Sequence, residues 1–118
     1  MKRNPDLIRE LLQNIEDCPA DNRMKFSVDA GDDVDTMKHL ELLIDAGYVK
    51  GAVLPDMRGP VAIVVSGLTW EGHDFVSAVR DNGIWQKTKE NVLQPAASWT
   101  FGMILEYAKA EARSRLGM

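Results

Sequence analysis

Residues 69–75, TWEGHDF, combine side chains that enzymes use for proton transfer. The run contains an imidazole at His73 and carboxylates at Glu71 and Asp74. A catalytic histidine–carboxylate pair requires the two side chains to be within hydrogen-bond reach. Neighbouring residues of a helix point about 100° apart, so His73 and Asp74 cannot face each other if this run is helical. The run therefore indicates the start of a helix, and we predict that His73 lies on its surface and is dispensable for activity.

Other residues of the run have structural interpretations. Thr69 is a good N-cap, because its hydroxyl can accept from the free N–H groups of the first turn. Gly72 allows the helix to approach something packed against it, and Trp70 is expected to cover the core. Phe75, Val76 and Val79 then recur at helical spacing and should be buried.

Potential metal ligands and nucleophiles are sparse in the rest of the chain. Cys18, His39 and His73 are far apart, and the sequence has neither a CxxC nor an HxxxH pair. There is no glycine-rich phosphate loop and no GxSxG nucleophile elbow. The sequence therefore predicts a protein that is not an enzyme and holds no metal or cofactor.

Composition indicates an ordinary globular protein. The 118 residues, 45% hydrophobic and 27% charged, predict a single domain over 1–118. No apolar run approaches the roughly 20 residues that span a bilayer, and no signal peptide is recognised at the start. A lone cysteine suits a reducing compartment. These features predict a cytoplasmic protein without a membrane anchor.

Caps, breakers and periodicity predict the order of elements. A helix begins at Asn4-Pro5 and stops before Pro19, and a short strand covers 24–28. A second helix covers about 33–46 and ends at Gly47. Strands at 48–54 and 61–69 form a hairpin around the turn-rich PDMRGP, and the TWEGHDF helix follows. Further helices are expected over 84–93 and 98–116.

Two apolar stripes define the expected burial. Val34, Met37, Leu40 and Ile44 form the inner stripe of the second helix. The last helix carries a longer stripe, made of Phe101, Ile104, Leu105, Ala108 and Ala112. This second stripe predicts either a homodimer through the C-terminal helix or cover for the first helix of the same chain.

Several blocks of sequence resemble known proteins. HLELLIDAGYVKG, followed by a hairpin and LTWEGHDF, resembles the winged-helix proteins. The whole chain looks like a family of small uncharacterised phage and prophage proteins, through MKRNPDLIRELL, HLELLIDAGYV, LTWEGHDF and RDNGIWQKTKE. The resemblance implies an α+β, winged-helix-like fold, helix–(short strand)–helix–β-hairpin–helix, followed by C-terminal helices. It places the core at about 4–81 and the helical extension at about 84–116.

The winged-helix resemblance also implies a way of binding duplex DNA. It makes 33–46 the recognition helix and 55–60 the tip of the wing. The candidate nucleic-acid contacts are then Lys38, His39, Lys50 and Arg58. The chain departs from the winged-helix pattern in one place, since DAGDD stands where a helix normally precedes the recognition helix. The interpretation is that of a phage-type transcription regulator in the bacterial host cytoplasm.

The charge distribution favours an alternative. Residues 29–45 contain six acids and one base, a net charge of −5, and the remainder of the chain carries +1. DNA affinity comes mainly from Lys and Arg at phosphates, which an acidic helix would repel. The alternative is a protein-interaction module, for example an inhibitor of or adaptor to a host protein. Its acidic helix over 32–45, with Asp32, Asp33 and Asp35, would bind a basic protein surface.

Overall fold

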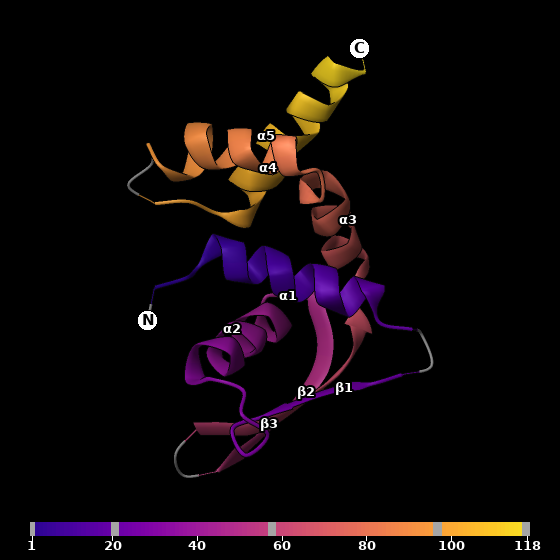
Figure 1. The fold of residues 1–118 in the computed structure, drawn as a ribbon, viewed down its shortest axis with the longest axis vertical. Coiled ribbons are helices and arrows are strands. Elements are labelled where there is room, and N and C mark those ends of the chain that lie inside the picture. The colour runs from indigo at the N-terminus through magenta and orange to yellow at the C-terminus, as the bar shows by residue number, and fades with distance from the viewer. Residues whose placement is uncertain (1, 20–21, 57–58, 96–97, 117–118) are drawn as a thin grey trace. The chain divides into compact units, whose positions relative to one another are not determined.

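The computed structural model describes residues 2–19, 22–56, 59–95 and 98–116 (Figure 1). The elements are α1 (Pro5–Asp17), β1 (Met24–Ser27), α2 (Val34–Asp45), β2 (Val49–Asp56), β3 (Gly59–Leu68), α3 (Trp70–Val79), α4 (Asn82–Thr88), the π-helical η1 (Lys89–Leu93) and α5 (Phe101–Arg115). The predicted α+β class and the helix–strand–helix–hairpin–helix layout are confirmed.

The chain divides into two compact units, which we call unit 1 (Met1–His73) and unit 2 (Asp74–Met118). The border falls inside α3 rather than between the predicted core and extension. That 1–118 behaves as a single domain stays a prediction. No helix in the described part of the chain is both long and apolar enough to cross a membrane.

Unit 1 is built on a three-stranded antiparallel sheet in the order β1-β3-β2. In the central strand β3, Ile63 and Val65 are buried, whereas Val64 between them pairs with Lys25 on one side and Ala52 on the other. Both α1 and α2 contact β3, and α2 also contacts β2 (Figure 1). The helices therefore cover the Ile63 face, and alternation along the strands leaves the Val64 face uncovered in unit 1.

The local signals predicted for unit 1 are present. The side chain of Asn4 caps α1 by accepting from the N–H of Leu7 at 3.2 Å. Thr69 caps α3, since its hydroxyl accepts from the N–H of Gly72 at 3.1 Å and donates to the carbonyl of Gly47 at 2.6 Å. Gly47 has φ +84°, the left-handed conformation expected after α2.

The first turn of α3 confirms one prediction and corrects another. A Cβ on buried Gly72 would fall on the backbone carbonyl oxygen of Tyr48, so the helix does approach closely here. Trp70, however, is 80% exposed and covers no core. Trp70 is the first residue of α3, and the side chains of α3 that are buried in the core come later, from Phe75 onward.

The buried face of α2 is turned relative to the predicted stripe. Met37, Leu40 and Leu43 are buried, but Ile44 is only half-buried and Val34 is 56% exposed. At about 100° per residue, Val34 lies about 120° around the helix from Leu40. The prediction of Val34 and Ile44 as core residues was therefore wrong, while that of Met37 and Leu40 is confirmed.

Part of the apolar stripe of α5, in unit 2, is buried. Ile104 and Ala108 are fully buried, and the rings of Phe75 and Phe101 meet edge to face with centroids 4.8 Å apart. Unit 2 also contains two ion pairs, from Lys87 to Glu111 and from Arg115 to Asp81. Phe101, Leu105 and Ala112 of the same stripe are half-buried, and the homodimer through the C-terminal helix stays a prediction.

Candidate functional site

The exposed face of α2 is acidic. Asp35 and Asp45 are exposed and Glu41 is half-buried, against a single exposed base, Lys38. Two exposed aliphatic side chains, Val34 and Leu42, lie among them. Lys38 therefore faces solvent as predicted, but with carboxylates around it.

His39 does not face outward and is only 2% exposed. Its Nε2 accepts the backbone N–H of Asn4 at 2.9 Å, and its Nδ1 lies 2.7 Å from the carbonyl oxygen of Asp35. Because the backbone N–H of Asn4 donates to Nε2, that nitrogen carries no hydrogen. The hydrogen of the ring is therefore on Nδ1, which donates to the carbonyl oxygen of Asp35. This neutral ring ties α2 to the start of α1. The prediction of His39 as an outward DNA contact was wrong, because that flank of α2 faces α1.

We expect His39→Ala to lower the free energy of unfolding by about 2–4 kcal/mol, since it removes two hydrogen bonds and leaves a space. The matched control is Lys38→Ala, one residue away and exposed, which should change stability by less than about 0.5 kcal/mol. Urea unfolding measures both. Equal stabilities of the two variants would contradict the structural role of His39.

Asp32 and Asp33, predicted as protein contacts, both have structural roles. Asp32 accepts the backbone N–H of Ser27 at 2.8 Å, which closes the turn between β1 and α2. Asp33 caps α2 by accepting the N–H of Thr36 at 2.7 Å. The hydrogen bonds from Thr36 hold the pKa of Asp33 below its ordinary value of 3.8. Of the three predicted carboxylates, only Asp35 is exposed and makes no capping or turn hydrogen bond.

The cap makes the stability of the protein depend on pH. Because the pKa of Asp33 is depressed in the folded state, its stabilising contribution is complete above 3.8 and is lost as the pH falls through the folded value. In Asp33→Asn the amide oxygen can still cap but does not titrate. We expect the wild type to lose stability relative to this variant below pH 3.8, by urea unfolding across pH. A difference that stays constant through that range would contradict the cap.

The uncovered face of the sheet carries two exposed lysines of unit 1. We define the outer sheet face by the outward positions Lys25, Ser27, Lys50, Ala52, Leu54, Ala62, Val64 and Ser66. These eight positions include two lysines and no carboxylate. In the described chain, neither lysine ammonium has an ion-pair partner. Lys50 is exposed as predicted, whereas Arg58 lies outside the described residues.

Lys25 was not predicted as a contact, although the sequence contains a signal for it. In MKFSV the alternation places Met24 and Phe26 on one face and Lys25 on the other. What the alternation cannot tell is which strand lies beside β1. The pairing of β1 with β3 puts Lys25 and Lys50 on one surface.

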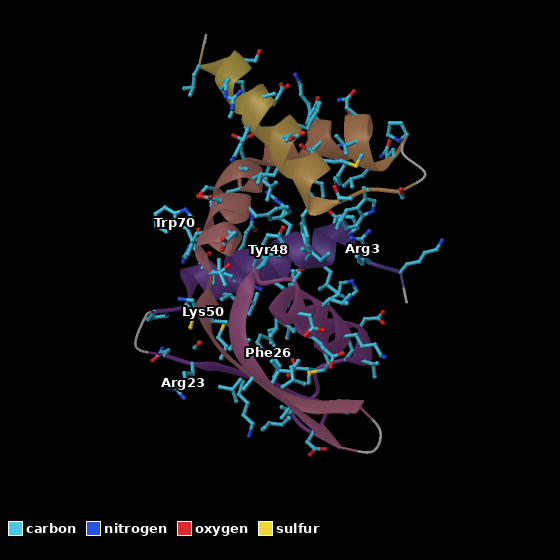
Figure 2. The ribbon with its side chains drawn as sticks, turned by 180° about the vertical axis from the view of Figure 1, so that it is seen from behind. Arg3, Arg23, Phe26, Tyr48, Lys50 and Trp70 are labelled. Atoms are coloured by element: carbon cyan, nitrogen blue, oxygen red, sulfur yellow. The ribbon has the colours of Figure 1, made fainter. Side chains whose placement is uncertain are left out.

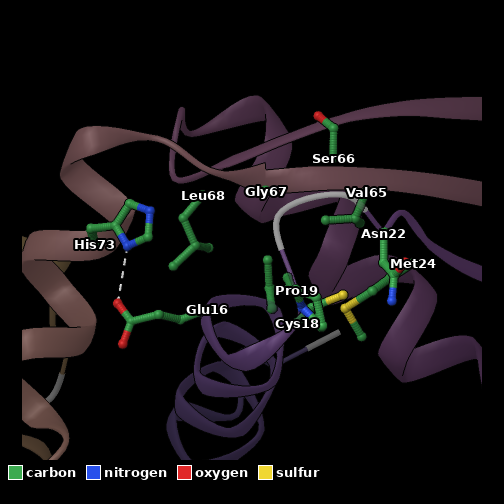
Figure 3. Close-up of a pocket in the computed structure, with 11 residues that line it drawn as sticks. Glu16, Cys18, Pro19, Asn22, Met24, Val65, Ser66, Gly67, Leu68 and His73 are labelled. Carbon is green, nitrogen blue, oxygen red and sulfur yellow. Dashed lines mark hydrogen bonds and ion pairs between the residues drawn. The ribbon is translucent and has the colours of Figure 1, made fainter.

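A pocket of about 260 Å³ lies at the end of α1 in unit 1 (Figure 3). It is lined by Ile15, Glu16, Cys18, Pro19, Asn22, Met24, Val65, Ser66, Gly67, Leu68 and His73. His73 Nδ1 is 3.0 Å from Glu16 Oε2, a pairing that sequence reasoning missed because it joins residues 57 apart.

The pocket does not assemble a recognisable catalytic group. The imidazole of His73 is turned to Glu16, and Figure 3 shows the half-buried Cys18 at the other end of the pocket, near Met24. Among the residues that the structure describes, no three His, Cys, Asp or Glu side chains are grouped so that they could hold a metal ion. A surface pair such as Glu16–His73 contributes about 0–1 kcal/mol, and the dispensability of His73 stays a prediction.

Comparisons with known proteins identify relatives without an assigned role. A family model described as Hypothetical protein (DUF2513) matches residues 2–98. An uncharacterized protein of Haemophilus influenzae is 28% identical over 112 residues, which cover 92% of this chain and 93% of the relative. No solved structure matches the chain.

Proposed function

We propose that this chain, which belongs to the DUF2513 family of hypothetical proteins, is a non-enzymatic DNA-binding regulator that contacts DNA through the outer sheet face. The observation that carries the proposal is the pair Lys25 and Lys50, on one open surface whose described positions include no carboxylate. Phosphates are bound by such cations, and each neutralised phosphate releases counterions.

A winged-helix relationship, a phage or prophage origin and action in the bacterial cytoplasm are parts of the same proposal. The sheet order β1-β3-β2, with α2 directly before the hairpin, supports the winged-helix relationship. The acidic outward face of α2 argues against that helix as the part that enters a groove. We therefore place the main contact on the sheet and hairpin, with Lys38 at most at the margin.

The experiment is a binding titration of a fluorescent DNA duplex at several salt concentrations. The logarithm of the affinity should fall linearly with the logarithm of the salt concentration, by about 0.9 for each phosphate neutralised. In the double variant Lys25→Gln/Lys50→Gln, we expect the slope to become shallower by about 1.8, with weaker binding to every sequence.

A charge-matched control separates specific contacts from net charge. Lys2→Gln/Lys109→Gln removes the same charge from two exposed lysines that lie off the outer sheet face. It should leave the slope close to that of the wild type. Equal slopes for the two double variants would refute the outer sheet face as the contact surface, and absence of DNA binding by the wild type would refute the function.

The second candidate is a protein-interaction module that uses the exposed face of α2. The observation that favours it is the combination of Asp35, Glu41 and Asp45 with exposed Val34 and Leu42, which suits a basic and partly apolar protein surface. Asp32 and Asp33 are left out of this surface because the fold already uses them.

The variant Asp35→Asn/Glu41→Gln/Asp45→Asn distinguishes the two functions by sign. It should strengthen DNA binding, because it removes repulsion of phosphates. If α2 instead binds a basic protein, the variant should slow association with that partner. Weaker DNA binding by the variant, with its thermal midpoint unchanged, would contradict the DNA-binding proposal.

A further inference from the structure

Trp70 is the most exposed large hydrophobic side chain in the described part of the protein, at 80%. Tryptophans are large and amphipathic, and they are enriched in binding interfaces. Trp70 is not required for the cap of α3, which the hydroxyl of Thr69 provides. The fold therefore leaves its indole ring free to contact a ligand.

Trp70 and Lys50 are both close in sequence to the end of the sheet where β2 begins and β3 ends. β2 begins at Val49 where β3 ends at Leu68, and these two residues are paired. The N–H of Thr69 bonds the carbonyl of Tyr48 at 3.1 Å, so Trp70 follows directly after the strand that adjoins Lys50. Figure 2 shows Trp70, Lys50 and Arg23 at one edge of unit 1, whereas Arg3 is at the opposite edge.

We infer that Trp70 is a base-stacking residue, and that the outer sheet face binds DNA that presents an unpaired base, in preference to a fully paired duplex. The inference rests on the proposed DNA binding. A positively charged surface beside an exposed aromatic ring is the combination by which proteins hold single strands, since every base offers a face for stacking. In a paired duplex the bases are stacked on each other and offer no free face.

Two exposed cations lie at the same edge of unit 1 as Trp70 (Figure 2). Lys50 and Arg23 are exposed, and no ion pair is formed by their side chains within the described chain. The nearest acid in sequence is Glu71. Burial raises the pKa of Tyr48, and the charge of Glu71 adds to that effect. A strand can therefore lie along Lys50 with one base on Trp70.

The test compares an oligo(dT) single strand of about 12 nucleotides with a duplex of equal length, at fixed salt. We expect Trp70→Leu to lower affinity for the single strand about tenfold and to leave affinity for the duplex unchanged. Trp70→Tyr, which keeps an aromatic ring, should retain most of the single-strand affinity. Oligo(dT) should also protect the exposed Trp70 of the wild type from quenching by acrylamide.

Two results overturn the inference while sparing the proposed function. One is single-strand binding that remains salt-dependent and sensitive to Lys25→Gln/Lys50→Gln but is unaffected by Trp70→Leu. The other is an equal loss for single strand and duplex, since stacking on an unpaired base cannot affect a duplex. The exposed ring would then be assigned to a protein partner. Failure of the wild type to bind either form overturns both proposals.

Discussion

Phe75→Ala should destabilise the protein by about 3–5 kcal/mol, the cost of removing a large aromatic side chain from a core. Phe75 is 1% exposed, and its ring meets the edge of Phe101 in unit 2. Domains of this size have about 5–15 kcal/mol of stability, so the substitution removes a large share of it and should lower the thermal midpoint by several degrees or more. Thermal unfolding followed by circular dichroism measures the change.

Trp70→Ala is the matched control for this prediction, because it removes an aromatic ring that is 80% exposed from the same helix. Its effect should stay within about 0.5 kcal/mol. A thermal midpoint that Phe75→Ala leaves unchanged would show that the interior of unit 2 is wrongly described.

Gly72→Ala should be the second strongly destabilising change, even though alanine favours helices over glycine by about 1 kcal/mol. The added methyl group would fall on the backbone carbonyl oxygen of Tyr48. Because Tyr48 is held by the N–H of Thr69 and by the end of α2, that oxygen cannot move freely. The clash should outweigh the helix preference, and we expect a net loss of about 1–3 kcal/mol.

Gly102→Ala is the matched control, because it makes the same substitution at a helical position where the added methyl group meets no backbone atom of another segment. Gly102 also lies in the first turn of a helix, α5, and a Cβ there meets only the hydroxyl of Thr100, at an ordinary 3.7 Å. Here the helix preference should win, with a gain of up to about 1 kcal/mol. If both variants shifted stability in the same direction, the close approach of α3 to Tyr48 would be refuted.

Local signals predicted most of the fold. Asn4-Pro5, Gly47 and Thr69 act through their own backbone or through the next turn, and each is where the sequence indicated. The alternation at 48–54 and 61–68, with its turn residues, likewise predicted the hairpin, which the structure extends to 49–56 and 59–68. Such features depend on neighbours within a few residues, which a single sequence contains.

The candidate site was harder to predict because its residues depend on distant neighbours. The spacing within α2 does not reveal that α1 covers the flank that carries His39. For Trp70, helical periodicity does not show that no other element in the described part of the fold packs against the first residue of α3. Lys25 was missed because the order β1-β3-β2 joins strands that are far apart in the chain. Burial and pairing at these positions follow from tertiary packing rather than from local preference.

The central claim is that the outer sheet face, rather than the exposed face of α2, binds DNA. Amide chemical-shift mapping by NMR, with oligo(dT) added to the labelled full chain, tests it most directly. We expect the largest changes at Lys25, Lys50, Ala52 and Ser66 and at the indole N–H of Trp70, with α2 from Asp35 to Asp45 unchanged. Changes concentrated on α2 or on unit 2 would contradict it.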